Sequence, residues 1–174
     1  MDAAEPGTES QDVEFELRCA CDSRILSVLR RFVTCIAEDM GFNEEQTSQI
    51  EMAVDEACAN VVRHAYKHRG VSPDLPDHVK CGDRSVQDSC AFFIRLSRSD
   101  ASLRISIIDH GVGISEEHTQ VTSMDEFHRR GGSGGLGGFI IHHYMDEVEY
   151  GASGDCGTVL TMTKFLQSST KSPA

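Results

Sequence analysis

Three polar side chains with the spacing of one helix face, Glu56, Asn60 and His64, could carry out chemistry together. A carboxylate in such a stripe can take a proton from a hydroxyl group or from water. An asparagine carbonyl oxygen is a hard ligand that suits Mg²⁺, which binds few protein groups and keeps phosphates and waters as its other ligands. The alternative is an ordinary solvated helix face, because polar stripes are a normal part of amphipathic helices.

A second motif lies at the end of an apolar run, where Ile107 and Ile108 lead into Asp109, Gly111 and Gly113. A buried aspartate at a strand end needs a partner, and it can accept a hydrogen bond from the exocyclic amine of a planar heterocycle such as adenine. The glycines would let the backbone approach that ligand closely. A plain Asp-Gly turn is the alternative for this motif.

The third motif is the glycine-rich run GGSGGLGG at residues 131–138, which leads into an apolar helical pattern. Backbone N–H groups at a helix N-terminus favour phosphate binding through their hydrogen bonds and through the helix dipole. The run contains no GxxxxGK[ST] signature and does not follow a strand in the Rossmann manner. A flexible linker is the alternative here.

The first elements that must position these motifs are a strand and two helices. The strand begins near Val13, and the helix after it is expected to have Ser23 as its cap and Gly41 as its end. Asn43, with Gln46 three residues later, forms a capping-box pattern that opens a second helix, which runs to about residue 67. The apolar residues of this helix lie roughly opposite the polar stripe: Ile50, Val54, Cys58, Val61 and Ala65.

The second half of the chain alternates between strands and a helix. The patterns predict strands at 91–97 and 103–109, a helix at 135–145, a strand at 147–150, a turn at 151–157 and a closing strand at 158–165. This order favours an α+β fold, a two-layer sandwich with helices covering one face of a sheet. We expect one domain at residues 12–166, a surface loop at 68–89, and flexible tails at 1–11 (acidic) and 167–174.

Composition excludes several classes of function. The 174 residues are enough for about one domain, and a formal net charge of −12 argues against nucleic-acid binding, which depends on cationic side chains. No apolar run approaches the ~20 residues that span a bilayer, and the acidic N-terminus is unlike a signal peptide. Seven cysteines without regular spacing favour reduced thiols in the cytoplasm; Cys35 and Cys58 fall on or beside the apolar sides of helices.

The order of the three motifs, followed by Gly157-Thr158 at the start of the last strand, resembles that of the GHKL ATPases. More narrowly, VDEACANVVRHAY, IIDHGVGI and GLGGFIIHHYMDEVEY look like the anti-sigma-factor serine/threonine kinases. The resemblance covers residues 15–165. It implies a sandwich with a mixed, mostly antiparallel sheet, binding of ATP and Mg²⁺, and a protein kinase activity.

The resemblance also implies roles for individual residues. Glu56 would be the catalytic base, Asn60 would hold Mg²⁺, and Asp109 would receive the adenine amino group with support from Thr158. The other ATP-binding residues would be two glycines of the first loop, two glycines of the second loop and the leucine between the latter two: Gly111, Gly113, Gly135, Gly137 and Leu136. Residues 115–134 would form a nucleotide lid, with Arg129 and Arg130 as phosphate contacts or as ordinary surface arginines.

The partners that the resemblance implies are a small antagonist protein of the anti-anti-sigma (STAS) type, a sigma factor and a second copy of this chain. The dimer would use the first strand and helix, because an edge strand invites pairing. Two alternatives stay open: a nucleotide-dependent binding switch with little or no kinase activity, and a detached histidine-kinase ATP-binding domain. The chain departs from the family at Gly138, where a larger apolar residue is common, and in its long 70–89 loop.

Overall fold

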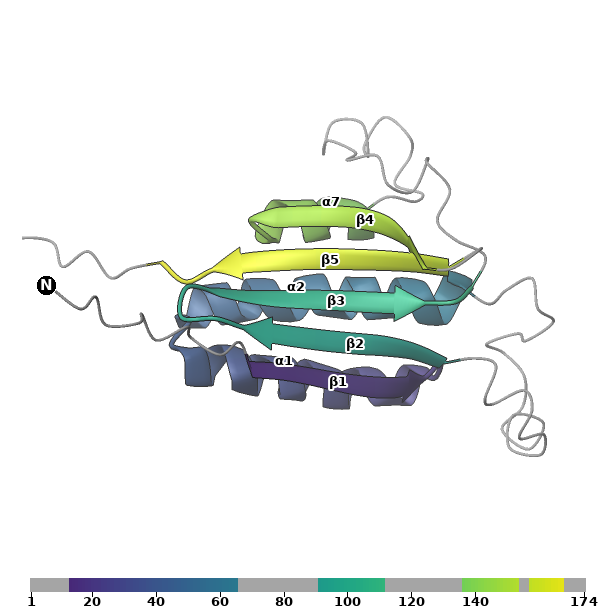
Figure 1. The fold of residues 1–174 in the computed structure, drawn as a ribbon, viewed down its shortest axis with the longest axis horizontal. Coiled ribbons are helices and arrows are strands. Elements are labelled where there is room, and N and C mark those ends of the chain that lie inside the picture. The colour runs from purple at the N-terminus through teal and green to yellow at the C-terminus, as the bar shows by residue number, and fades with distance from the viewer. Residues whose placement is uncertain (1–12, 66–90, 112–135, 154–156, 168–174) are drawn as a thin grey trace, which may run out of the picture.

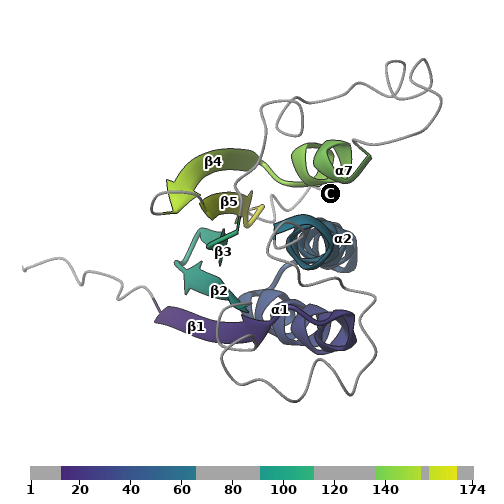
Figure 2. The same ribbon diagram turned by 90° about the vertical axis from the view of Figure 1, so that its right-hand side faces the viewer.

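The computed structural model describes residues 13–65, 91–111, 136–153 and 157–167, which form a five-stranded sheet with helices packed on one face (Figures 1 and 2). The strand order is β1-β2-β3-β5-β4. We expected a mixed, mostly antiparallel sheet, and all four pairs of described strands are antiparallel. The strands are β1 (Val13–Ala20), β2 (Ala91–Arg98), β3 (Ser102–Asp109), β4 (Glu147–Ser153) and β5 (Gly157–Phe165).

The sheet buries alternate residues against the helices. On β3, Ile105 and Ile107 are buried while the intervening Ser106 is only half-buried, as the period of two in a half-covered strand requires. The register places Asp109, the last residue of β3, opposite Thr158 on β5. The same alternation that makes the core therefore brings two of the predicted site residues side by side.

The first helix, α1 (Leu26–Met40), follows a short 3₁₀ turn at Ser23–Ile25 and ends at Gly41, whose φ of 89° is left-handed. The expected Ser23 cap is wrong. Asp22 has the extended backbone of a cap residue, and its carboxylate accepts a hydrogen bond from the Arg24 backbone N–H at 2.9 Å.

The second helix, α2 (Glu44–Asn60), has the predicted capping box: Asn43 Oδ1 accepts from Gln46 N at 2.9 Å, and Gln46 Oε1 accepts from Asn43 N at 3.3 Å. All five apolar residues predicted for its inner face are buried. The helix does not continue regularly, because Val61–Ala65 form a π-helical turn. This irregularity comes directly after Asn60.

The last helix, α7 (Leu136–Tyr144), is held at its C-terminal end by a buried lysine. Lys164 Nζ donates to the Tyr144 carbonyl oxygen at 2.7 Å and lies 3.2 Å from Asp146 Oδ1, while Asp146 Oδ2 accepts from the Phe165 backbone N–H at 2.7 Å. These contacts fix the end of α7 against β5, and α7 packs along α2 (Figure 2).

Two further details differ from the sequence-based predictions. The turn at 151–157 is too long, because β4 continues to Ser153 and pairs Gly151 with Val159. Cys58 is buried as expected, whereas Cys35 is exposed on α1. The predicted tails and the loop at 68–89 lie almost entirely outside the described residues. In the described part of the chain, no helix is both long enough and apolar enough to cross a lipid bilayer.

Candidate functional site

The helical part of the site is formed by α2 and α7. Glu56 and Asn60 stand one turn apart on α2, and both are half-buried. Neither side chain has a hydrogen-bond or ion-pair partner among the residues that the structure describes. A half-buried carboxylate and a half-buried amide that are left without protein partners are available to a ligand.

Gly137, in the first turn of α7, lies directly against this pair. A Cβ atom built on Gly137 would be 2.7 Å from Oε2 of Glu56 and 3.4 Å from Nδ2 of Asn60. Only a residue without a side chain leaves the Glu56 carboxylate in place, whereas 3.4 Å is an ordinary contact for Asn60. The closeness of Glu56 explains why glycine occurs here inside a helix despite its low helix propensity. The structure therefore brings the polar stripe and the glycine-rich motif together, as predicted.

The strand part of the site is centred on Asp109. Its carboxylate is buried, and Oδ1 accepts a hydrogen bond from the Gly111 backbone N–H at 2.7 Å. Thr158, also buried, lies directly opposite Asp109 in the pairing of β3 with β5. The two residues are thus neighbours at the end of the sheet, and the bond from Gly111 orients the carboxylate.

Burial raises the pKa of Asp109, and the hydrogen bonds from Gly111 and Thr158 and the charge of His110 offset only part of that increase. A raised pKa means that the charged carboxylate is less favourable here than in water. A further donor supplied by a ligand would stabilise the charged form, because hydrogen bonds to a carboxylate favour its ionisation.

Two close backbone approaches hold the strand part of the site, one between it and the π-helical turn after α2 and one between β5 and β3. A Cβ atom on Gly111 would lie 2.0 Å from the carbonyl oxygen of Ala65, the last residue of the π-helical turn. A Cβ atom on Gly157 would lie 2.1 Å from the carbonyl oxygen of Asp109. Both glycines are needed for steric reasons, and they place Asp109 at the end of the sheet where α2 also ends (Figure 1).

The remaining polar residues of these motifs, and the histidines of α7, lie as follows. His64 is exposed on the π-helical turn, and Leu136 is exposed at the start of α7. His142 faces Tyr150 with ring centroids 6.0 Å apart, and His143 stacks on Phe139 at 5.3 Å, so both rings make aromatic contacts. Gly113, Gly135, Arg129, Arg130 and the predicted lid at 115–134 lie outside the described residues.

Sequence reasoning missed a contact beside Asp109. His110 Nδ1 and Ser153 Oγ are 3.0 Å apart, and the His110 ring meets the edge of Phe93 at 6.1 Å between centroids. The contact ties the end of β4 to the residue after Asp109. No sequence signal could have found it, because Ser153 was assigned to a turn rather than to a strand end.

Comparisons with known proteins show the family to which the chain belongs. The model of the histidine kinase-like ATPase domain family matches residues 19–164. The serine-protein kinase RsbW of Halalkalibacterium halodurans is 31% identical over 157 residues, covering 90% of this chain and 86% of its own. The anti-sigma F factor of Caldanaerobacter subterraneus is 26% identical over 151 residues, covering 87% and 92%.

Two solved structures share the fold. A chain of the SiaB–SiaC complex from Pseudomonas aeruginosa superposes with a TM-score of 0.58 at 10% identity, covering 90% of this chain and 91% of that one. The RsbU and RsbW domains of a Mycobacterium tuberculosis protein give a TM-score of 0.55 at 14% identity, covering 88% of this chain and 32% of theirs. The chain belongs to the family of histidine kinase-like ATPase domains and, within it, to the RsbW group of serine-protein kinases.

Proposed function

We propose that this protein is an ATP-dependent serine/threonine kinase that acts as an anti-sigma factor in the cytoplasm and phosphorylates a small antagonist protein of the STAS type. The observation that supports the proposal is the closeness of Gly137, in the first turn of α7, to Glu56 and Asn60: a Cβ atom on Gly137 would lie 2.7 Å from Oε2 of Glu56 and 3.4 Å from Nδ2 of Asn60. The relatives named as serine-protein kinase RsbW and anti-sigma F factor support the same activity.

ATP binds with its adenine amino group donating to Asp109 and its phosphates near the N-terminus of α7, where unpaired backbone N–H groups favour negative charge. The Gly111 backbone N–H orients the Asp109 carboxylate for that donor, and Thr158 favours its charged form. The glycine loops of residues 111–113 and 135–137 supply the backbone that approaches the nucleotide, with Leu136 between the last two glycines.

Asn60 fits Mg²⁺ because an amide oxygen is a hard ligand, and among the described residues its side chain, which lies beside the first turn of α7, has no hydrogen-bond partner. The ion would neutralise charge on the transferred phosphoryl group when bound. Glu56 accepts the proton of the substrate serine as the serine oxygen bonds to the γ-phosphorus, and the bond from that phosphorus to the β,γ-bridging oxygen breaks to release ADP.

The metal assignment predicts that Asn60→Ala binds ATP but loses most of the gain in affinity that Mg²⁺ gives the wild type. Isothermal titration of ATP with and without Mg²⁺ measures this difference, and we expect about a tenfold loss of the Mg²⁺ effect, which corresponds to about 1.4 kcal/mol. Gln49→Ala, a half-buried residue three turns before Asn60 on α2, is the control. An unchanged Mg²⁺ effect in Asn60→Ala would remove Asn60 as the ligand.

Phosphorylation of the antagonist adds negative charge to its interface with this acidic chain and so favours its release. The protein is then free to hold a sigma factor, a DNA-binding protein whose basic faces suit the net charge of −12.

The protein acts as a homodimer in which β1, an edge strand of the sheet, pairs with a second copy. A sedimentation mass near 19.1 kDa at all concentrations would exclude the dimer.

A further inference from the structure

A buried lysine on β5 holds the C-terminal end of α7. Lys164 is only 7% exposed, and its ammonium group donates to the carbonyl oxygen of Tyr144, the last residue of α7, at 2.7 Å. The same ammonium group pairs with Asp146 at 3.2 Å, and the other oxygen of that carboxylate accepts a hydrogen bond from the backbone N–H of Phe165. We call Lys164, Asp146 and the Tyr144 carbonyl group the α7 clamp. A cation at this position also suits the negative end of the helix dipole.

The same end of β5 is tied to α2. The carbonyl oxygen of Phe165 accepts a hydrogen bond from Nε2 of Gln46, a buried residue in the first turn of α2, at 3.4 Å. Tyr144 lines a groove with residues near the start of α2, whereas Gly137 lies against Glu56 near its end, so α7 and α2 run antiparallel. The end of β5 therefore contacts both helices at the ends that lie away from the candidate site.

Helix α7 depends on contacts with the rest of the fold. It has nine residues, of which two are glycines, and isolated helices of this length are marginal in water. Among the residues that the structure describes, the bond from Lys164 is the one hydrogen bond that joins α7 to another element. The packing of buried side chains such as Ile141 is not directional, and packed helices can slide past one another by small amounts. The α7 clamp is thus the contact that fixes α7 along α2.

We propose that Lys164 is a positioning residue for phosphoryl transfer, because the α7 clamp holds Gly137 in its place against Glu56. This role rests on the proposed function, in which Glu56 is the base. For stability alone an apolar side chain would serve as well as a buried lysine, whereas charge-assisted hydrogen bonds fix a direction and a distance. Tyr144 and Gly137 are about 10 Å apart along the helix at ~1.5 Å per residue, so a shift at the clamp is carried to the site.

The test variant is Lys164→Met/Asp146→Asn, which removes both charges of the α7 clamp together and so leaves no buried charge unpaired. The backbone N–H of residue 146 keeps its bond of 3.0 Å to the carbonyl oxygen of Thr163, and the asparagine oxygen can still accept from Phe165. We therefore expect this variant to fold, with a far-UV circular dichroism spectrum like that of the wild type. Asp146→Asn alone, a milder change at a carboxylate that is 36% exposed, is the second variant and should shift kcat in the same direction.

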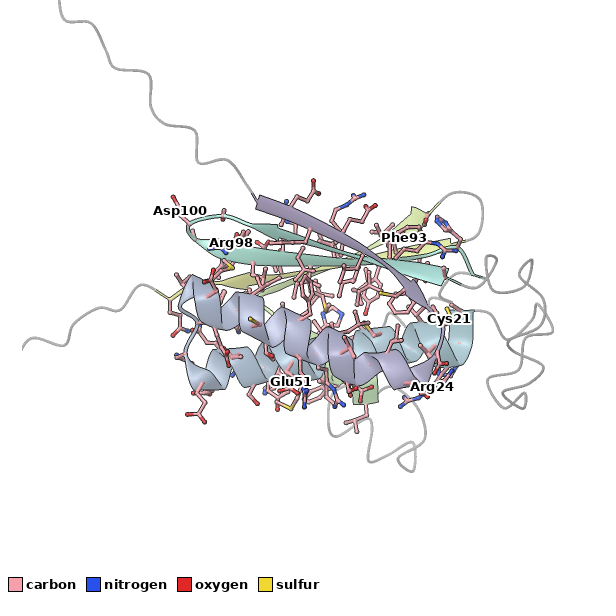
Figure 3. The ribbon with its side chains drawn as sticks, turned by 90° about the horizontal axis from the view of Figure 1, so that it is seen from below. Cys21, Arg24, Glu51, Phe93, Arg98 and Asp100 are labelled. Atoms are coloured by element: carbon pink, nitrogen blue, oxygen red, sulfur yellow. The ribbon has the colours of Figure 1, made fainter. Side chains whose placement is uncertain are left out.

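The matched control is Arg98→Met/Asp39→Asn, which removes an ion pair of 2.7 Å that ties α1, and not α7, to the sheet. Arg98 lies on β2 beside the turn that carries Asp100 (Figure 3). Lys164 lies at the same end of the sheet, because the start of β3 pairs there with the end of β5. Each double variant therefore removes one positive and one negative charge from the same end of the molecule. The control should transfer phosphate within about twofold of the wild type.

The measurement is kcat for transfer from saturating Mg-ATP to a STAS-type protein, with the dissociation constant of ATP titrated alongside. We expect Lys164→Met/Asp146→Asn to lower kcat about 10-fold, because Glu56 loses the fixed backbone beside it, and to change ATP affinity less than about threefold. In a Gly137→Ala background, where Glu56 is already displaced, the same change should lower kcat less than about twofold. An equal loss in both backgrounds would indicate a merely structural role and would overturn the proposal, and so would wild-type kcat in the test variant.

Amide hydrogen exchange tests the α7 clamp without kinase activity. The amides of α7 should exchange at least ~10-fold faster in Lys164→Met/Asp146→Asn than in the wild type, whereas Arg98→Met/Asp39→Asn should leave them unchanged. Unchanged exchange of α7 in the test variant would show that the clamp does not hold the helix, and would overturn the proposal whether or not the wild type transfers phosphate. A wild type that transfers no phosphate but shows the expected exchange would contradict the proposed function, and with it the role in transfer, while the clamp itself would stand.

Discussion

Glu56→Gln should abolish phosphoryl transfer while leaving ATP binding nearly intact. The amide has the size of the carboxylate and cannot accept the serine proton, so transfer should fall by about 10²–10⁴-fold, the usual contribution of a general base. The measurement is incorporation of the γ-phosphoryl group from labelled Mg-ATP into a STAS-type protein, alongside a titration of ATP with the variant. The backbone near Gly137 should not move, because no bulk is added.

Asp55→Asn is the matched control, since it removes a neighbouring carboxylate of the same helix that pairs with Arg30 instead. We expect this variant to transfer phosphate within about twofold of the wild type, as is usual for an exposed ion pair. Transfer that persists in Glu56→Gln would remove the proposed base. Acid-labile phosphate on a histidine would instead favour the detached histidine-kinase domain, and no transfer by the wild type would favour the binding switch.

Gly137→Ala should lower transfer by about 10²-fold without destabilising the fold. The new methyl group would stand 2.7 Å from Oε2 of Glu56, the far end of a flexible side chain, so the carboxylate moves aside and the backbone does not. A displacement of about 1 Å at a catalytic group costs about 10²-fold in rate. Alanine also favours a helix over glycine by about 0.5–1 kcal/mol, so the thermal midpoint should stay level or rise.

The control for Gly137→Ala is Gly151→Ala, where the new Cβ atom would meet Val159 at an ordinary contact distance of 3.9 Å. This variant should keep full transfer activity. If Gly137→Ala transfers phosphate as fast as the wild type, Glu56 does not need its present position for catalysis. A large loss of stability in Gly137→Ala would show that the backbone, and not the carboxylate, has moved.

Local patterns in the sequence were enough to predict most of the fold. The capping box of Asn43 and Gln46, the buried face of α2 and the strand at 103–109 each depend on residues a few positions apart, and each prediction is confirmed. The boundaries were less predictable. Asp22 and Ser23 are both good cap residues, and only the backbone conformation decides between them.

The site itself depends on contacts across the chain that no local pattern contains. Gly137 meets Glu56 because α7 packs on α2, and Gly111 meets Ala65 because α2 ends in a π-helical turn. The π-helical turn at Val61–Ala65 could not be predicted from its residue types, because packing determines where such a turn forms. The order of the motifs suggested that they converge, but their distances came only from the structure.

The central claim is that Asp109 recognises adenine in a site shared with Asn60 and Glu56. The most direct test measures the affinities of ATP and GTP for the wild type, for Asp109→Asn and for Asp100→Asn. The Gly111 backbone N–H donates to the carboxylate, so an asparagine at 109 would turn its carbonyl oxygen toward Gly111 and its NH₂ group toward the adenine amine. Two donors would then face each other.

We predict that the wild type and Asp100→Asn, a change in the exposed β2–β3 turn, prefer ATP to GTP by at least about 10²-fold. Asp109→Asn should bind ATP about 10–100-fold more weakly and lose most of that preference, which corresponds to about 1.4–2.7 kcal/mol. If Asp109→Asn binds ATP as tightly as the wild type, or if the wild type does not distinguish adenine from guanine, the account of the site is contradicted.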